Sequence, residues 1–435
     1  MRSPFLLISI VAGLLAAPAA SAAEYVPGEV IVKYRDGTTA KERTHLLRDS
    51  DMALDERLPG DSRELAIRDG DTVPEKLAEL RREPDVEYAV PNFVARASFR
   101  PNDPGYGRQW HLRDGFGIEM PTAWDTARRL GAPGGRGATV AVLDTGVAYR
   151  RTRRFRRAPD LRGFARGYDF VGRDRRPDDE NGHGTHVAGA LAQTTNNRRG
   201  AAGIAYRARI MPVRVLDSVG EGDAGTIARA LRWAARRRPD VINLSLEFGP
   251  EVRTADVPDV VSALRYAHRR GVTVVAAGGN SGDDRQISLP ARGRGVIAVG
   301  ATTHRGCQAV YSNKGRDLDV VAPGGGEDAA LNGNPYDSAL CRPNRPGRWI
   351  YQQTFTSGLR RFGLPPGYEG TSMSAAQVSG IVALVRATRR LGTRRPSPGA
   401  MEAHIKRTAR EAGPAGFDPY YGHGLVSATR ALASR

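Results

Sequence analysis

The alternation of apolar and polar residues divides the chain into three stretches of different character. The first stretch, residues 5–17, is mainly apolar, follows Arg2 and is too short to span a bilayer. Ala20-Ser21-Ala22 then fits the small-residue pattern of a signal-peptidase site. We expect residues 1–22 to be a cleaved signal peptide and the mature protein to be secreted (extracellular), with no membrane attachment after signal removal. An uncleaved anchor is the alternative.

The second stretch, residues 23–98, has the pattern of a small α+β unit. Residues 29–34 alternate apolar and polar positions, which predicts a strand. Residues 72–82 place Val73, Leu77 and Leu80 at helical spacing. Residues 86–90 predict a further strand, ended by Pro91.

The third stretch begins with an extended linker over residues 99–108 and continues as a long α/β pattern. Short, largely apolar runs alternate with amphipathic helical segments, which indicates a mainly parallel sheet covered on both faces. Ligands of such sheets bind beyond the carboxyl ends of the strands. The expected strands are 139–143, 210–215, 241–244, 272–277 and 296–299, and the expected helices include 225–237 and 257–269.

Three short windows carry residues suited to nucleophilic chemistry, and the first of them lies directly beyond the predicted strand 139–143. They are centred on Asp144, His183 and Ser372. A serine hydroxyl becomes a nucleophile when an imidazole takes its proton and a carboxylate orients that imidazole. Taken singly, each window has a plainer interpretation as a turn, a helix cap or a small core residue, and His186 is expected to serve packing. Together, in this chain order, the three windows specifically indicate a nucleophilic triad of aspartate, histidine and serine.

Charge and cysteine content add two expectations. The formal charge is +18, and the net acidic stretch 23–100 precedes a strongly basic remainder. We nevertheless do not expect nucleic acid as a partner, because the arginines are scattered over predicted helices; the run 150–157 is expected to be a solvated loop. Cys307 and Cys341 are the two cysteines, and an oxidising compartment favours one disulfide between them over two free thiols.

The motifs resemble those of the subtilisin family of serine peptidases (peptidase S8, subtilases). The windows that carry the resemblance are Val142-Leu143-Asp144-Thr145-Gly146-Val147, Gly182-His183-Gly184-Thr185-His186-Val187-Ala188-Gly189 and Gly370-Thr371-Ser372-Met373-Ser374. The resemblance implies an α/β fold: a subtilisin-like three-layer domain with a mainly parallel central sheet, preceded by a small α+β (ferredoxin-like) propeptide of the inhibitor I9 type. The implied domains are 1–22 signal peptide, 23–98 propeptide and 99–435 catalytic domain.

The resemblance also implies roles for individual residues. Asp144, His183 and Ser372 take the triad roles, and Asn280 in Val274-Val275-Ala276-Ala277-Gly278-Gly279-Asn280-Ser281 takes that of the oxyanion-hole asparagine. The resemblance further implies that the peptide substrate pairs with the segment holding Ser245 and Leu246, and that Gly278 and Gly279 leave room for it. Because no acidic residue is clearly placed at Leu289-Pro290-Ala291, the expected preference at P1, the residue before the cleaved bond, is apolar or aromatic.

Partners and cofactors follow from the same resemblance. The expected partners are polypeptide substrates and the protein's own propeptide, which assists folding, inhibits the enzyme and is removed by self-cleavage between about residues 92 and 102. A monomer is expected. No cofactor is expected for the chemistry. A structural calcium ion is possible, with oxygen ligands from Asp169, Asp174, Asp178 and Asp179. The alternative is that these residues form a solvated charged loop.

The chain departs from the family's pattern at several positions. Ala376 and Gln377 replace a common Pro-His pair after the serine, and Glu247 replaces a common glycine, which puts substrate specificity in doubt. Residues 327–364 have the appearance of an insertion. The expected function is a secreted, self-processing serine endopeptidase; an inactive peptidase-like binding protein and a polyanion binder are the alternatives.

Overall fold

The computed structural model of the protein describes residues 25–95, 98–330, 340–393 and 395–433. The expected signal peptide lies outside these residues. The chain forms two compact units, residues 1–97 and 98–435, which we describe separately. No helix among the described residues is both long and apolar enough to cross a membrane.

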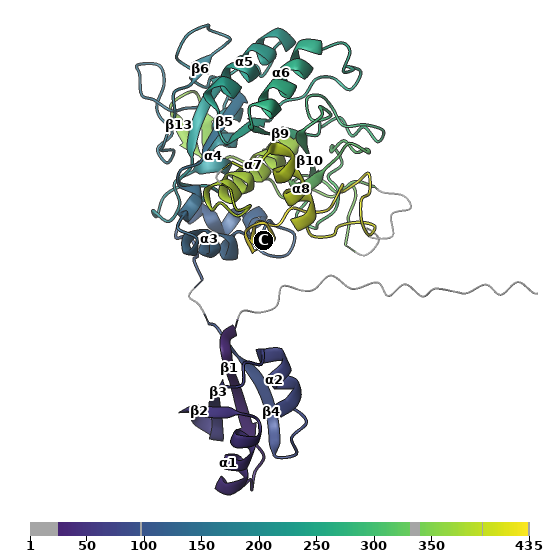
Figure 1. Ribbon diagram of the computed structural model, residues 1–435. Coiled ribbons are helices and arrows are strands. Elements are labelled where there is room, and N and C mark those ends of the chain that lie inside the picture. Colours follow the sequence, from purple (N-terminus) through teal and green to yellow (C-terminus); the bar gives the residue numbers. More distant parts are fainter. Residues whose placement is uncertain (1–24, 96–97, 331–339, 394, 434–435) are drawn as a thin grey trace, which may run out of the picture. The chain divides into compact units, whose positions relative to one another are not determined.

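The N-terminal unit is an antiparallel sheet of order β2-β3-β1-β4 with two helices (Figure 1). Val30 pairs with Leu65 of the neighbouring strand, and both side chains are fully buried in the core of this unit. β4 runs past Pro91, so the predicted end of this strand was wrong. Because β4 is an edge strand, it tolerates a residue that lacks an N–H donor. The elements are β1 Tyr25–Tyr34, α1 Ala40–Asp49, β2 Met52–Arg57, β3 Ser62–Ile67, α2 Val73–Leu80 and β4 Val86–Phe93.

The larger unit is built on a seven-stranded sheet of order β11-β10-β9-β8-β5-β7-β6, in which every strand pair is parallel. The expected apolar strands are all present, and β6 and β11 extend the sheet at its two edges. The strands are β5 Thr139–Asp144, β6 Tyr168–Asp169, β7 Arg209–Arg214, β8 Val241–Leu244, β9 Thr273–Ala277, β10 Val296–Thr302 and β11 Val320–Pro323; β12 Thr354–Ser357 and β13 Arg361–Gly363 form a separate hairpin.

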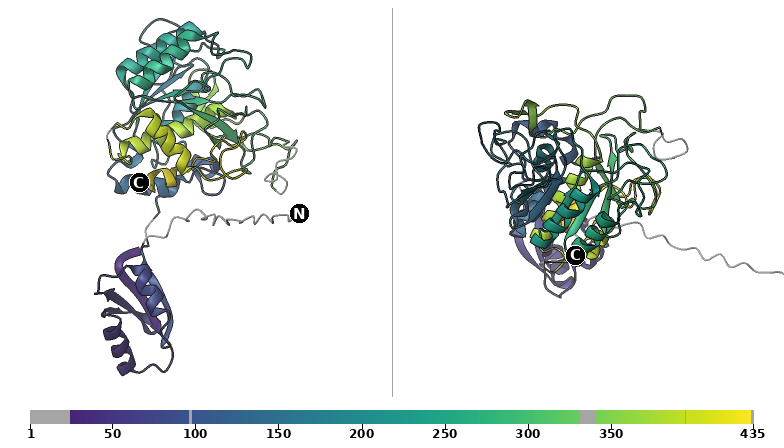
Figure 2. Two further views of the ribbon diagram at one scale, coloured as in Figure 1. Left: turned by 45° about the vertical axis from the view of Figure 1, so that its right-hand side comes forward. Right: turned by 90° about the horizontal axis from the view of Figure 1, so that it is seen from above.

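Alternate residues of each central strand pack into two different cores. In β5, Val140 and Val142 face one core, while Ala141 and Leu143 face the other. Figures 1 and 2 show α5 and α6 side by side on one side of the sheet, with α7 on the other. The helices are α3 Met120–Arg129, α4 His183–Ala192, α5 Ala224–Arg237, α6 Pro258–Arg269, α7 Thr371–Ala387, α8 Pro398–Thr408 and α9 Ala428–Ala433.

Helix α7 is the centre of its layer. All of its residues from Thr371 to Arg386 are buried. Small residues make this burial possible: a Cβ on Gly380 would lie 2.7 Å from Cγ2 of Ile204, closer than carbon atoms approach. The small-residue pattern therefore places the N-terminus of a rigid helix among the carboxyl ends of the strands.

A disulfide joins Cys307 to Cys341, with 5.8 Å between their Cα atoms. Both side chains are buried. The bond links the segment after β10 to the segment expected to be an insertion. It closes a loop between two cysteines that are 34 positions apart in the sequence. Loop-closure entropy for this length corresponds to about 3–4 kcal/mol.

Replacing both cysteines by serine should therefore lower the free energy of unfolding by up to about 4 kcal/mol. Urea denaturation with and without a thiol reductant measures the effect. Reductant should shift the midpoint of the wild type toward that of the double variant and leave the double variant unchanged. Equal midpoints for wild type and double variant without reductant would contradict the prediction.

Candidate active site

The carboxyl end of β5 and the start of α4 bring an aspartate and a histidine together. Asp144 is the last residue of β5 and is fully buried, while His183 is the first residue of α4. His183 Nδ1 lies 2.7 Å from Asp144 Oδ1, which also accepts the N–H of Thr145 at 2.7 Å. A proton on Nδ1 completes the first contact and leaves Nε2 free to accept another proton.

The position of His183 depends on a buried carboxylate and on close backbone packing. Asp179 accepts the N–H groups of Gly182 and Thr185, each at 2.9 Å, at the beginning of α4. A Cβ on Gly184 would lie only 2.1 Å from the carbonyl oxygen of Gly146. Glycine at position 184 therefore lets the first turn of the helix approach the end of β5, which brings the imidazole to the carboxylate.

The electrostatics of His183 suit a base. Burial acts to lower its pKa, but the charge of Asp144 and the hydrogen bond to it prevail, so that the pKa of His183 is raised above its ordinary value of 6.5. The Asp144 carboxylate thus stabilises the imidazolium form, which is the form that exists after proton uptake.

Ser372 lies in the first turn of α7 and is held by contacts with the end of β8. Ser245 Oγ donates to the carbonyl oxygen of Ser372 at 2.9 Å, and Ser372 Oγ donates to that of Ser245 at 3.3 Å. Asn243 Nδ2 in turn donates to Ser245 Oγ at 2.9 Å, and Ser379 Oγ of α7 donates to Asn243 Oδ1 at 2.9 Å. These bonds fix the register between the strand and the helix that carries Ser372.

Asn280 lies directly beside the start of α7. Its Oδ1 accepts the N–H and the hydroxyl of Thr371 at 2.8 and 3.0 Å, so its amide Nδ2 points the other way. That Nδ2 donates to Glu247 Oε1 at 3.0 Å. A side-chain amide whose oxygen is held in this manner is a preoriented donor.

A single cavity of about 570 Å³ collects these groups. His183, Ser372 and Asn280 all line it, as predicted for groups that act on one substrate. Asp144 lies behind His183. The remaining lining residues are Thr145, Asn181, Leu216, Val219, Gly220, Glu221, Gly222, Ile227, Ser245, Leu246, Glu247 and Phe248.

The expected substrate-binding residues divide into two groups. Ser245 and Leu246 line the cavity, whereas Gly278 and Gly279 are buried and are not part of its lining. A Cβ on Gly279 would lie 2.7 Å from Glu247 Oε2, so this backbone lies beneath the glutamate. Sequence reasoning noted Glu247 as a departure but missed its bond to Asn280, and it missed the loop 216–222.

His186 is a structural residue, as expected. It is fully buried, its ring stacks on Tyr368 with 4.1 Å between the centroids, and its Nε2 lies 3.1 Å from the carbonyl oxygen of Ile350. Burial lowers its pKa to about 3. Gln377, one of the residues that depart from the family's pattern, is also buried, and its amide donates to the carbonyl oxygen of Pro323.

The residues expected to ligate calcium do not fit an ion site. Asp178 forms a two-pronged ion pair with Arg150, and Asp169 accepts two backbone N–H groups and lies 3.3 Å from Arg214. Asp179 caps α4. Arginines and backbone donors therefore take the carboxylate oxygens that an ion would need.

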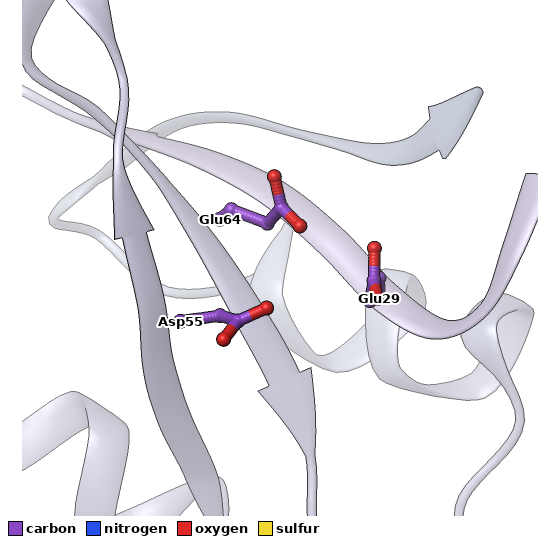
Figure 3. A group of neighbouring side chains, drawn as sticks. All are labelled: Glu29, Asp55 and Glu64. Atoms are coloured by element: carbon purple, nitrogen blue, oxygen red, sulfur yellow. The ribbon is translucent and has the colours of Figure 1, made fainter. Parts of the chain in front are cut away.

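Acidic residues converge closely in the N-terminal unit. Among the residues the structure describes, the groups of three with ligand atoms within 4.8 Å of one another are Glu29, Asp55 and Glu64 (Figure 3) and Asp69, Asp71 and Glu79. The buried ammonium of Lys76 forms ion pairs with all three members of the second group. In the first group, burial and then the hydrogen bond with Glu29 raise the pKa of Glu64.

Comparisons with protein families match both units. Residues 135–424 match the model of the subtilase family (Peptidase_S8), and residues 14–92 match that of the fervidolysin N-terminal prodomain. The second match is to a prodomain, but not specifically to the I9 type that we expected.

Individual relatives agree with these matches. The chain is 38% identical to the thermophilic serine proteinase of Bacillus sp. strain AK1, over 72% of this chain and 73% of that protein. It is 32% identical to the extracellular protease of Xanthomonas campestris pv. campestris, over 97% and 76%. It is 34% identical to thermitase of Thermoactinomyces vulgaris, over 77% and 99%.

A solved structure of proteases from Pseudoalteromonas arctica superposes with a TM-score of 0.57 at 31% identity, covering 77% of this chain and 99% of that one. The parallel sheet, the family match and these relatives agree with one another. The chain therefore belongs to the subtilase family and is a subtilisin-like serine endopeptidase with an N-terminal prodomain.

Proposed function

We propose that this protein is a secreted, self-processing endopeptidase that cleaves polypeptides through an acyl-enzyme formed on Ser372. The observation that carries the proposal is the 2.7 Å contact between His183 Nδ1 and Asp144 Oδ1 beside a cavity that His183 shares with Ser372. A name given to one relative, "Extracellular protease", supports export.

In the proposed reaction, His183 Nε2 takes the proton of Ser372 as the hydroxyl oxygen attacks the substrate carbonyl. The new C–O bond forms a tetrahedral intermediate, and Asp144 stabilises the imidazolium. His183 then gives its proton to the leaving amine as the peptide bond breaks. Water, activated by the same imidazole, hydrolyses the ester and restores the serine.

Asn280 supplies the charge stabilisation in this proposal. Its Nδ2 and the backbone N–H of Ser372, at the N-terminus of α7, are donors for the oxyanion of the intermediate. In a related subtilase, the loss of one such donor costs roughly 10²–10³ in kcat, and we expect the same order of effect here. Because Thr371 already holds Asn280 Oδ1, little reorientation is needed when negative charge develops.

The prodomain completes the proposal as chaperone and inhibitor of the catalytic unit. Its match to a known prodomain supports this role. The boundary between the compact units, after residue 97, falls within the expected cleavage interval of about 92–102. Calcium at residues 169–179 is not part of the proposal, because arginines and backbone donors already hold the carboxylates there.

Self-processing provides the first test of the nucleophile. Wild-type precursor should release a fragment of about 75 residues after signal removal, whereas Ser372→Ala should remain unprocessed, because the attacking oxygen is missing. Intact mass and N-terminal sequencing measure the outcome. Ser374→Ala is the matched control: this serine lies on the same helix but donates to the carbonyl oxygen of Ala322, so its loss should leave processing intact. Processing of both alanine variants alike would contradict the assignment.

The pH profile tests the Asp144–His183 pair. The base acts only when neutral, and the pKa of His183 is raised, so kcat/KM should rise with pH through a midpoint above 6.5. Asp144→Asn removes the interaction that raises this pKa and leaves the effect of burial, so the midpoint should move to lower pH.

The same substitution should reduce kcat by about 10⁴, as in other serine peptidases. Asp174→Asn is the control, because this exposed carboxylate accepts the N–H of Arg176 and makes no contact with His183. An unchanged midpoint in Asp144→Asn would show that a group other than His183 controls the rise of kcat/KM with pH.

A further inference from the structure

The carboxylate of Glu247 occupies an unusual place at the active site. Its Oε1 accepts Asn280 Nδ2 at 3.0 Å, and its Oε2 accepts the backbone N–H of Asn280 at 3.0 Å. The amide proposed to stabilise the oxyanion is therefore already bonded to a fixed negative charge. The second N–H of this amide remains available to a substrate carbonyl, but the oxyanion would then form beside the carboxylate, and two like charges would repel each other.

Neighbouring residues hold the carboxylate in place. Ser288 Oγ donates to Glu247 Oε2 at 3.1 Å, and Asn313 Nδ2 donates to Ser288 Oγ at 3.1 Å. Gly279 passes beneath, where a Cβ would lie 2.7 Å from Glu247 Oε2. A hydroxyl has one proton to donate, and here it is directed at the glutamate, so the site is built to hold an acceptor.

The cavity has the opposite charge to the rest of the protein. The chain carries 65 Lys and Arg against 47 Asp and Glu, yet the described residues that line the cavity include two glutamates, Glu221 and Glu247, and no lysine or arginine. Among the ion pairs formed by the described residues, none includes Glu247. Its partners are neutral donors, and its charge remains uncompensated at the mouth of a substrate cavity.

Geometry determines which substrate residue meets this charge. The carbonyl attacked by Ser372 places its oxygen at Asn280, and that carbonyl belongs to the P1 residue. The P1 side chain therefore starts beside the group to which Glu247 is bonded. A cation at P1 would offer the carboxylate a charged partner in place of the Asn280 amide, while Ser288 could continue to donate to Oε2.

We propose that Glu247 determines P1 specificity, and that a P1 lysine or arginine pairs with its carboxylate and thereby relieves the repulsion between that carboxylate and the oxyanion at Asn280. The inference rests on the proposed roles of Ser372 and Asn280. Apolar P1 residues leave the carboxylate without a cationic partner beside the oxyanion, so they lose transition-state stabilisation and not only affinity. The proposal replaces the expectation of an apolar or aromatic P1.

Matched peptide substrates that differ only in Arg or Phe at P1 test the proposal. Mature wild-type enzyme should cleave the Arg substrate with a kcat/KM at least about 10-fold higher. Glu247→Gln keeps an acceptor for Asn280 but removes the charge, and should reduce kcat/KM for Arg by about 10- to 100-fold. Glu247→Gly removes the acceptor altogether, and should raise kcat for the Phe substrate because the charge that opposes the oxyanion is gone.

Glu251→Gln is the control of equal charge change. Glu251 is exposed and close to Glu247 in sequence, but it lies outside the cavity lining. The ratio of kcat/KM for the Arg substrate to that for the Phe substrate should therefore stay at the wild-type value. Benzamidine, a small aromatic cation, gives a second measurement on wild-type enzyme alone: it should inhibit competitively against the Arg substrate, and more weakly as salt concentration rises.

The possible failures are distinguishable. The inference is overturned if wild-type enzyme has a higher kcat/KM for the Phe substrate than for the Arg substrate. It is also overturned if Glu247→Gln leaves the ratio of these two kcat/KM values unchanged. Either result leaves the proposed function intact. Folded wild-type enzyme that cleaves neither substrate would contradict the proposed function, and the inference with it.

Discussion

The active site depends on one buried contact between a carboxylate and an imidazole at the carboxyl end of β5. Asp144 is removed from water at the end of a strand whose side chains fill two cores, and the ring N–H of His183 is the side-chain donor that its charge meets there. A lone carboxylate at this depth would be strongly destabilised. The same constraint that makes the pair necessary for stability makes the imidazole a stronger base, so stability and reactivity share one interaction.

The fold gathers the other groups around this pair because parallel strands end at a common edge. β8 leads to Ser245 and Glu247, β9 leads towards Asn280, and α7 begins at the same edge with Ser372. Hydrogen bonds between these segments, rather than sequence proximity, set the final geometry: Ser245 is bonded to Ser372, and Asn280 to Thr371. The scaffold thus positions donors and nucleophile before any substrate arrives.

Much of this arrangement could be predicted from the sequence, and the exceptions have physical reasons. Strands such as 139–143 are almost entirely apolar because both faces are buried, so their pattern is strong. The predicted end of a strand at Pro91 was wrong, because an edge strand does not need an N–H donor at every residue. The sequence pattern did not reveal that Asp178, one of the expected calcium ligands, pairs with Arg150, because the two residues are 28 positions apart. Glu247 was recognised as an odd residue, but its contact with Asn280 joins segments 33 residues apart and has no local signature.

The central claim is that Ser372 is the activated nucleophile of a working triad. Labelling of the folded wild-type protein with a fluorophosphonate, followed by mass spectrometry of the digested adduct, tests it most directly. The account predicts one adduct per molecule, on Ser372, and strongly slowed labelling in His183→Ala. A label on another serine, or none on folded wild-type protein, would contradict it.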